Sequence, residues 1–289
     1  MSIMISGFSD EISSDLAEQI RVVKKLGMHY ISLRGINGKN IADFSVDEFS
    51  STILPLLNKE GIKVSSIGSP IGKISVNDEE AFQSQLTILD TLCQIAVLLK
   101  TKYIRIFSFF IDKEDDYDSY EEVVVNKLAH FINIAEKYDI ILLHENEKDI
   151  FGDIGRRCVT LFNRLPSPYF KAIFDFANFV QCGDNTLDVY SLLEKHIVYF
   201  HIKDAVYTDN HNVLCGTGNG YIKALLSTAI YGGYSGFLTL EPHLADFGSF
   251  KSLELDNSKK VINTDTKITG AQGYEMQYNA LMDIIKDIK

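Results

Sequence analysis

The chain lacks several features that would place it in other classes of protein. None of its four cysteines, at positions 93, 158, 182 and 215, stands in a Cys-x-x-Cys pair, so neither a zinc knuckle nor a redox dithiol is indicated. Basic residues are outnumbered, with 28 Lys and Arg against 39 Asp and Glu and a formal net charge of −11. Because nucleic-acid binding depends on basic surfaces, a small polar substrate is the better expectation.

Two further absences concern location and domain organisation. The first residues show no basic-then-apolar leader, and no uninterrupted apolar run approaches the roughly 18 residues that a membrane span needs. We therefore expect a cytoplasmic protein with no membrane partner. No linker or shift in composition divides the 289 residues, of which 46% are hydrophobic, so one domain over residues 1–289 is predicted.

The apolar pattern predicts a (β/α)8 TIM barrel. Eight strand-like segments alternate with helical ones and begin near residues 3, 29, 62, 103, 139, 171, 197 and 236. Alternating units of this kind give a parallel sheet, and eight of them close into a barrel of about 250 residues. A doubly wound sheet is the competing architecture, but no Gly-x-Gly-x-x-Gly follows the first strand.

Two segments outside the strands carry specific expectations. A capping box at residues 45–48 predicts one helix that continues to Gly61. A long polar segment, residues 245–270, precedes the last helix, and both belong to an extended C-terminal region of about 245–289. Loops of this length are usually functional or disordered, so we expect it to cover the site or to reach a neighbouring subunit.

Four consecutive strands end on side chains that bind divalent metals. These residues are Glu145, Asp175, His201 and Glu241. The carboxyl ends of all strands of a barrel open on one face, so the four side chains should surround one point. Alternation supports this, because it turns Leu143, Ile173, Tyr199 and Thr239 inward on the same strands.

The same stretches resemble the xylose isomerase-like barrel superfamily of sugar isomerases, epimerases and inosose dehydratases. The resemblance rests on His-Glu-Asn-Glu at 144–147, Phe-Asp-Phe-Ala-Asn at 174–178, His-Ile-Lys-Asp at 201–204, Gly-Thr-Gly-Asn-Gly at 216–220 and Leu-Glu-Pro-His at 240–243. It implies that the four strand-end residues bind one divalent ion: manganese, magnesium, cobalt or zinc. Many relatives have a histidine where this chain has Asn178, and acids where it has Thr217 and Asn219, so the substrate is left open.

Such a site supports proton transfer next to a carbonyl through an enediolate. Glu145 and Glu241 are the expected catalytic carboxylates, one removing the proton and the other returning it. Substrate-binding candidates are Arg34, Lys73, Arg105, Glu147, Asn178, Lys203 and His243. His144 faces outward by alternation, which favours a structural role.

Other interpretations stay open at this stage. An inosose-type dehydratase would use the same ligands, and a non-catalytic barrel would bind a sugar unchanged. A metal phosphodiesterase that resembles the apurinic endonucleases would need extra histidines where this chain has Arg34, Ser69 and Ser108. Arg34 could instead pair with Asp10 or Glu11, and a lone acid at a strand end is more often a helix N-cap. The resemblance and the long tail favour a homodimer or homotetramer.

Overall fold

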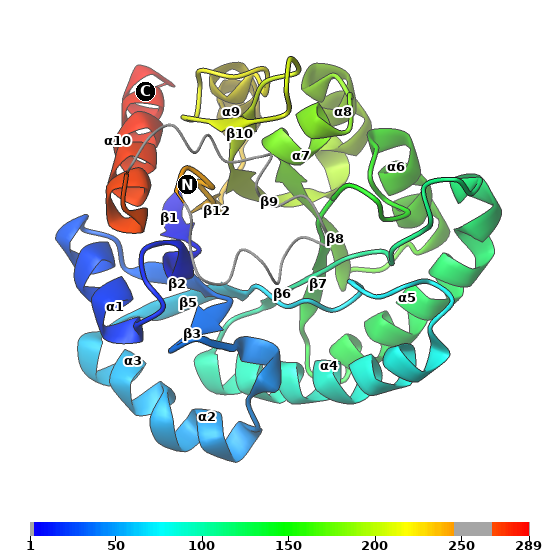
Figure 1. The fold of residues 1–289 in the computed structure, drawn as a ribbon, viewed down its shortest axis with the longest axis horizontal. Helices are drawn as coiled ribbons and strands as arrows, with labels where there is room; N and C mark the ends of the chain where they lie inside the picture. Colours follow the sequence, from blue (N-terminus) through cyan, green and yellow to red (C-terminus); the bar gives the residue numbers. More distant parts are fainter. Residues whose placement is uncertain (1–2, 246–267, 289) are drawn as a thin grey trace.

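The computed structural model describes residues 3–245 and 268–288 and places eight parallel strands in a ring (Figure 1). Around the ring these are β1 (Met4–Gly7), β12 (Phe237–Leu240), β9 (Ile197–Ile202), β8 (Phe170–Asp175), β7 (Ile141–His144), β6 (Tyr103–Ile106), β5 (Lys63–Ile67) and β2 (Tyr30–Leu33). A parallel bridge between Phe8 and Ser32 joins the two end strands. The strands thus form a nearly closed barrel, which confirms the predicted fold and excludes a doubly wound sheet.

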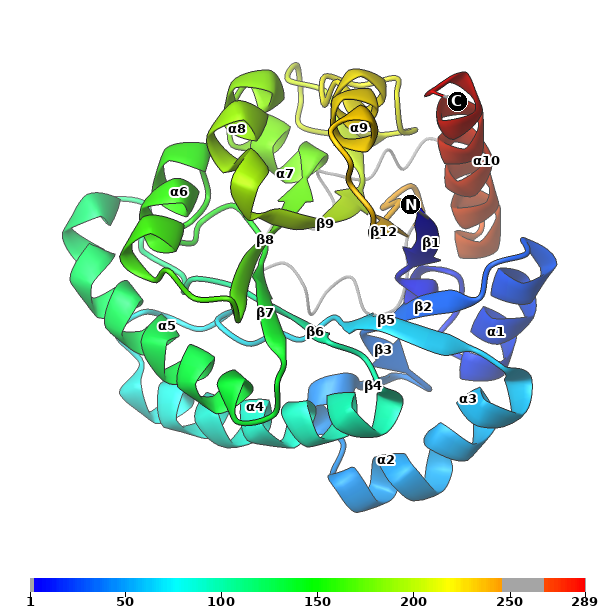
Figure 2. The same cartoon turned by 180° about the vertical axis from the view of Figure 1, so that it is seen from behind.

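Helices surround the ring on its outer side in both views of the ribbon (Figures 1 and 2). They are α1 (Leu16–Lys25), α2 (Val46–Thr52), α3 (Leu54–Glu60), α4 (Glu79–Leu99), α5 (Glu121–Glu136), α6 (Gly155–Arg164), α7 (Phe176–Gln181), α8 (Thr186–Leu193), α9 (Ile222–Tyr231) and α10 (Gly270–Ile288). Short 3-10 turns are η1 (Ser9–Glu11), η2 (Ile41–Asp43), η3 (Tyr117–Tyr120) and η4 (Glu194–His196). Two small hairpins, β3 (Gly35–Ile36) with β4 (Lys39–Asn40) and β10 (Asp204–Ala205) with β11 (Asn212–Val213), extend from strand ends.

Each of the eight strands begins within two residues of its predicted start. The single helix predicted from the capping box to Gly61 is wrong, because α2 ends at Thr52 and α3 begins at Leu54. Ser45 caps α2 through its hydroxyl, as the box implies. Pro55 lies at the start of α3, where its missing N–H is tolerated, whereas inside one continuous helix it would remove a hydrogen bond.

The inward face of the strands carries an apolar layer that lies below the strand ends. Leu143, Ile173, Tyr199 and Phe237 form a buried cluster there, separate from the larger core between strands and helices. The larger core contains their outward neighbours, such as Leu142, Phe174, Phe200 and Leu240. Side chains therefore alternate between the two faces as predicted, and this alternation directs the residues at the strand ends.

One outer helix, α4, bears on the expectation that the protein has no membrane span. By length and composition alone α4 could cross a membrane, but it packs against α5 and α2 and buries Phe82, Leu89 and Leu92. We therefore assign it to the outer layer, and the absence of a membrane partner stays a prediction.

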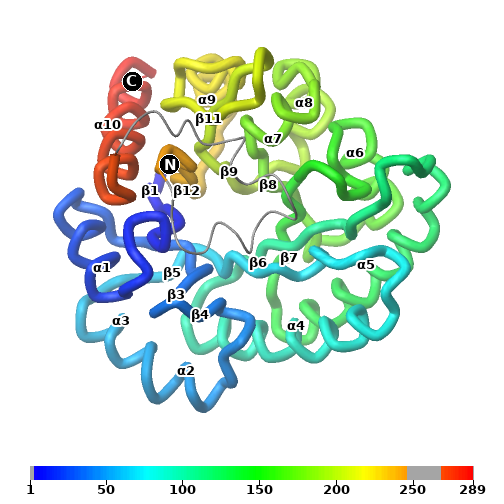
Figure 3. Tube along the Cα trace, in the orientation of Figure 1, coloured from blue at the N-terminus to red at the C-terminus, as the bar shows by residue number. Residues whose placement is uncertain are grey.

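The last helix, α10, completes the outer layer between α9 and α1 (Figure 3). Lys25 of α1 forms an ion pair with Glu275 of α10. The segment expected to cover the site or reach another subunit falls mostly on residues 246–267, which lie outside the described residues.

Candidate metal and sugar site

Four side chains from successive strand ends meet at one point. Glu145 follows β7, Asp175 is the last residue of β8, His201 lies in β9 and Glu241 follows β12. Each offers one ligand atom, and these atoms all lie within 4.8 Å of one another. His201 Nδ1 lies 2.5 Å from Glu145 Oε1, 3.1 Å from Glu241 Oε2 and 3.9 Å from Asp175 Oδ2. The structure thus brings together the four residues that the sequence selects.

Each of the three carboxylates directs its two oxygens to different neighbours. Asp175 Oδ1 caps α7 by accepting the Asn178 N–H at 2.8 Å, while Oδ2 faces the cluster. Glu145 Oε2 accepts from Arg105 Nη1 at 3.0 Å, and Glu241 Oε1 accepts from Arg34 Nη1 at 2.9 Å. The N-cap interpretation and the ligand interpretation are therefore compatible for Asp175, because each uses a different oxygen.

Burial and like charges set the proton affinities of this cluster. Burial raises the pKa of Asp175 to about 7, against the opposing charge of Lys203. Burial alone would lower the pKa of His201, but the Glu145 and Glu241 carboxylates outweigh it and raise that pKa to about 9. Burial opposes ionisation of Glu241 too, but Lys203 and His201 hold its pKa well below the usual range. The site concentrates negative charge that positive groups must balance.

The residues present fit a divalent cation. Asp175 Oδ2 and Glu241 Oε2 are buried and accept no well-formed hydrogen bond from any residue in the described ranges. Buried carboxylate oxygens seldom lack such partners, so these two have lone pairs to offer an ion. One imidazole nitrogen with three carboxylates is a donor set that suits zinc, manganese, cobalt and magnesium. The other ring nitrogen, His201 Nε2, is buried and finds no hydrogen-bond partner among the described residues.

The sequence model of one protein family, described as the xylose isomerase-like TIM barrel, matches residues 20–261, which are most of the chain. The chain belongs to the xylose isomerase-like TIM barrel family. The probable L-ribulose-5-phosphate 3-epimerase UlaE of Mycoplasma pneumoniae is 24% identical over 157 residues, which are 54% of this chain and 50% of the relative. The match thus spans about half the length of that relative.

Solved structures agree with the family assignment at the level of the fold. The IolI protein, crystallised with a zinc atom, superimposes with a TM-score of 0.76 at 16% identity over 100% of this chain and 99% of the other. A D-tagatose 3-epimerase-like protein gives 0.73 at 13% identity over 99% and 100%. Likenesses at these identities show a common barrel.

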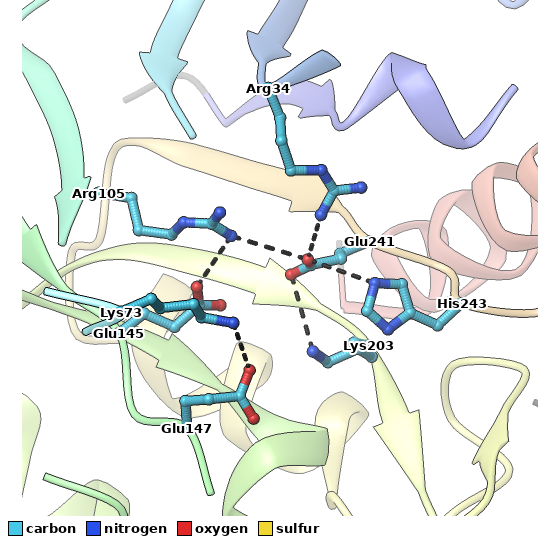
Figure 4. Close-up of a pocket in the computed structure, with 8 residues that line it drawn as sticks. All are labelled: Arg34, Lys73, Arg105, Glu145, Glu147, Lys203, Glu241 and His243. Atoms are coloured by element: carbon cyan, nitrogen blue, oxygen red, sulfur yellow. Dashed lines mark hydrogen bonds and ion pairs between the residues drawn. The ribbon is translucent and has the colours of Figure 1, made fainter. Parts of the chain in front are cut away.

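In this xylose isomerase-like barrel a small cavity opens beside the four-residue cluster (Figure 4). Its lining consists of Arg34, Lys73, Arg105, Glu145, Glu147, Lys203, Glu241 and His243. Two are the expected catalytic carboxylates, and the other six were expected to bind substrate. The cavity is thus formed almost wholly by charged side chains, as a site for a polar ligand requires.

The positive groups of the cavity are held by ion pairs with its acids. Lys203 Nζ lies 3.2 Å from Asp175 Oδ2 and 3.8 Å from Glu241 Oε2, so it neutralises two candidate ligands. Lys73 Nζ lies 3.2 Å from Glu147 Oε2, and both side chains are largely buried. Burial disfavours the charged form of Glu147, yet Lys73 prevails and lowers its pKa to about 2. Glu147 is therefore part of the cavity wall and not a solvated loop charge.

Asn178 lies differently from its prediction, whereas His144 lies as predicted. Asn178 does not line the cavity, because its side-chain amide donates to the backbone carbonyl of Asn146 at 2.7 Å. His144 points away from the barrel axis, as alternation predicts. Its Nε2 lies 3.0 Å from Ser108 Oγ, and its ring packs edge-on against Phe162 and Phe170. Both side chains support the loops around the site.

The structure also places the acids Asp10 and Glu11 beside the site, where both pair with Arg34. Arg34 contacts Asp10 Oδ2 at 2.8 Å and Glu11 Oε1 at 3.3 Å, so the pairing considered for it occurs together with its bond to Glu241. Glu11, Glu241 and His243 form a second group of close ligand atoms. Because the Arg34 guanidinium bonds both glutamates, this second group already holds a cation.

Asp204 is a residue that sequence reasoning missed. Its buried carboxylate accepts the backbone N–H groups of Ala205, Gly216, Gly218 and Gly220, at 2.9 to 3.0 Å. A Cβ on Gly218 would lie 2.4 Å from Asp204 Oδ1, so the close approach requires glycine. The alternating glycines at 216–220 were the available signal, because such a loop can wrap its amides around one anion.

Proposed function

We propose that this protein is a divalent-metal-dependent isomerase or epimerase of a sugar, sugar phosphate or sugar acid. The observation that carries the proposal is the convergence of Glu145, Asp175, His201 and Glu241, whose ligand atoms lie within 4.8 Å of one another. Two of the carboxylates reach His201 Nδ1 from β7 and β12, strands that β8 and β9 separate in the ring. A sugar bound between them would present one face to each glutamate.

The chemistry follows from this arrangement. An ion held by the four residues would draw electrons from a carbonyl and its neighbouring hydroxyl, which makes the adjoining C–H more acidic. One of Glu145 and Glu241 removes that proton, and the other returns a proton. Return to the neighbouring carbon gives an isomer, and return to the opposite face gives an epimer. Lys203, beside Asp175 and Glu241, would orient these two ligands.

The names of the relatives favour sugar epimerisation within the family. UlaE is named as a probable L-ribulose-5-phosphate 3-epimerase, and one structural neighbour as D-tagatose 3-epimerase-like. A nucleic-acid substrate is disfavoured by the net charge of −11 and by Arg34, Ser69 and Ser108 at positions where histidines were required. A homodimer or homotetramer and a cytoplasmic location stay predictions, which light scattering and fractionation would test.

Metal analysis is the first test. The protein is purified with manganese supplied, and the metal content of wild type is compared with that of Glu145→Gln, Glu241→Gln and the double variant. We expect about one ion per chain in wild type and none in the double variant, since two of three carboxylates are lost. Glu136→Gln, an exposed glutamate on α5, is the matched control. Full retention of metal by the double variant would contradict the site.

Exchange in deuterated water is the second test, and it separates the candidate activities. Ketoses, ketose phosphates and inososes are incubated with metal-loaded protein, and the products are examined by NMR. An isomerase or epimerase leaves deuterium on the carbon next to the carbonyl. A dehydratase yields an unsaturated product that has lost water, and a binding protein leaves every compound unchanged. Either of these two outcomes would replace the proposed reaction.

A further inference from the structure

Three cations that line the cavity alternate with two aromatic rings that lie behind them. The Arg34 guanidinium carbon lies 4.3 Å from the ring centre of Phe8, and that of Arg105 lies 4.9 Å from the same centre. Arg105 also lies 4.9 Å from the ring centre of Phe107, whose other cation is Lys73, with its Nζ at 4.5 Å. We call these five residues, Arg34, Phe8, Arg105, Phe107 and Lys73, the cation–aromatic row. Arg105 is its middle member and contacts both rings.

Each cation of the row pairs with a glutamate of the cavity, and Arg105 also lies 3.8 Å from Glu241 Oε1 (Figure 4). Arg34 bonds Glu241 at 2.9 Å, Arg105 bonds Glu145 at 3.0 Å and Lys73 pairs with Glu147 at 3.2 Å. The first two of these glutamates are the candidate proton-transfer groups. The bond to Arg34 or Arg105 occupies the oxygen that does not face His201. The row therefore sets which oxygen of each carboxylate is free to face the metal cluster.

Among the described residues, the two phenylalanines lie outside both apolar clusters of the barrel. Phe8 and Phe107 are at most 1% exposed, yet neither belongs to the cluster inside the barrel or to the larger core outside it. The negative face of an aromatic ring attracts a cation, most strongly where water is excluded, and an aliphatic side chain offers no such face. A planar guanidinium stacked on a ring also keeps its donors in a fixed direction.

The loop after β5 keeps both rings in place. A Cβ on Gly68 would lie 2.4 Å from Phe8 Cε1, and one on Gly72 would lie 2.0 Å from the backbone oxygen of Phe107. Gly72 also has φ of +87°, a conformation that side chains other than glycine rarely adopt. The loop backbone thus packs directly on the Phe8 ring, and on the backbone of Phe107 from which the second ring extends.

We propose that Phe8 and Phe107 are positioning residues of this site. They hold Arg105 between them, and Phe8 also supports Arg34, so that Glu145 and Glu241 keep one oxygen directed at the metal cluster. This inference rests on the proposed function, because the orientation of these glutamates matters only if they bind the ion and move the proton. Phe107 acts through Arg105, whereas Phe8 acts through both arginines and also packs edge-on against the His201 ring, with the ring centres 5.1 Å apart.

The test is a double-mutant cycle on Mn²⁺ affinity, measured by calorimetry on the full chain. Phe107→Leu, Arg105→Lys and the pair are compared with wild type. We expect each single variant to lose roughly tenfold in Mn²⁺ affinity. Losses of this size follow when residues that orient the metal ligands are replaced. In the Arg105→Lys background, Phe107→Leu should change the affinity less than about twofold, since the planar guanidinium that stacks on the ring is already lost. Phe107 is the deciding residue because its other cation, Lys73, holds no candidate metal ligand.

Phe8→Leu should weaken Mn²⁺ binding at least as much as Phe107→Leu, because it releases Arg34 and also removes the ring contact with His201. Phe49→Leu is the matched control, a fully buried ring that packs on Phe44 far from these cations. Its Mn²⁺ affinity should stay within about twofold of that of wild type, although its melting temperature should fall about as much as in Phe8→Leu and Phe107→Leu. In active protein, Phe107→Leu should lower kcat about tenfold and change KM less than kcat, because it displaces the Glu145 carboxylate and leaves every lining side chain present.

The outcomes separate the two proposals. Wild-type protein that binds no Mn²⁺ would overturn the proposed function and this inference with it. Wild-type binding, with effects of Phe107→Leu and Arg105→Lys that simply multiply, would overturn the inference alone. The same holds if Phe8→Leu and Phe107→Leu bind Mn²⁺ no more weakly than Phe49→Leu.

Discussion

The inward face of the barrel changes character between two neighbouring levels of the same four strands. The lower level consists of Leu143, Ile173, Tyr199 and Thr239, and the upper level of Glu145, Asp175, His201 and Glu241. Each upper residue follows its lower partner by two positions, so both point to the barrel axis. One step of the pleat thus separates a neutral layer from a cluster of buried charges.

The two levels differ in how completely they satisfy their own polar atoms. Below, the Tyr199 hydroxyl makes contacts of 2.7 to 3.0 Å with Ser65, Ser66 and Thr239. Above, Asp175 Oδ2, Glu241 Oε2 and His201 Nε2 find no well-formed hydrogen bond among the described residues. A level that completes its own bonds contributes stability, whereas one that leaves them open is suited to a ligand. Substitutions should therefore act on stability below and on metal binding above.

The largest expected effect is on metal binding at the upper level. Asp175→Asn keeps the shape of the side chain and an oxygen for the α7 cap, but it removes the charge at Oδ2. Replacing a residue that only orients a metal ligand costs up to about 100-fold in affinity. Asp175 is itself a candidate ligand, so we expect Mn²⁺ affinity to fall at least about 100-fold, with the far-UV circular dichroism spectrum retained. Asp188→Asn, an exposed residue of α8, should leave the affinity unchanged. Wild-type affinity in Asp175→Asn would remove this residue from the ligand set.

The next effect links the upper level to stability through its ligand. Mn²⁺ at about 100 times its dissociation constant should raise the free energy of unfolding by about 2.7 kcal/mol, because it binds the folded chain alone. Denaturation with and without Mn²⁺ measures this. The rise should be absent from the Glu145→Gln, Glu241→Gln double variant. An equal rise in that variant would mean that the ion binds elsewhere.

Both levels were predictable from the sequence, for the same reason. A strand has a strict two-residue period, so an apolar run that ends in an acid fixes which residues share the axis face. The four strand ends converge because the carboxyl ends of a parallel barrel open together. That argument needs no knowledge of loops. Strand period and barrel topology alone thus predict that Glu145, Asp175, His201 and Glu241 lie together, although the first and last are more than 90 residues apart in the chain.

Contacts made by the loops were not predictable in this way. Lys73 and Glu147 lie 74 positions apart in loops after β5 and β7, where no periodicity sets the direction of a side chain. Phe8 and Phe107, each just beyond a strand, look like ordinary core residues in the sequence. Their role depends on two arginines and two glycines from other strand ends. By contrast, the break between α2 and α3 carried a visible signal in Pro55.

A smaller effect is expected at the lower level, on stability alone. Tyr199→Phe keeps the ring but removes the hydroxyl that joins Ser65, Ser66 and Thr239. Because buried polar groups then lose a partner, unfolding should become easier by about 1–3 kcal/mol. Mn²⁺ affinity should stay within about twofold, since the ring that contacts His201 is kept. Tyr221→Phe, at an exposed tyrosine, is the control for urea denaturation.

The smallest effect tests how sharply the two levels are separated. Thr239 lies two residues before Glu241 on the same face of β12, and its hydroxyl donates to Tyr199 at 2.7 Å. Thr239→Val keeps the branched shape and removes that one bond, so we expect a loss of about 1 kcal/mol in urea denaturation. Thr228→Val, at an exposed position of α9, should cost less. Mn²⁺ affinity should not change, because no charge or ligand is altered. A marked fall in affinity would mean that the lower level also sets the direction of Glu241, and the two layers would then be one cooperative network.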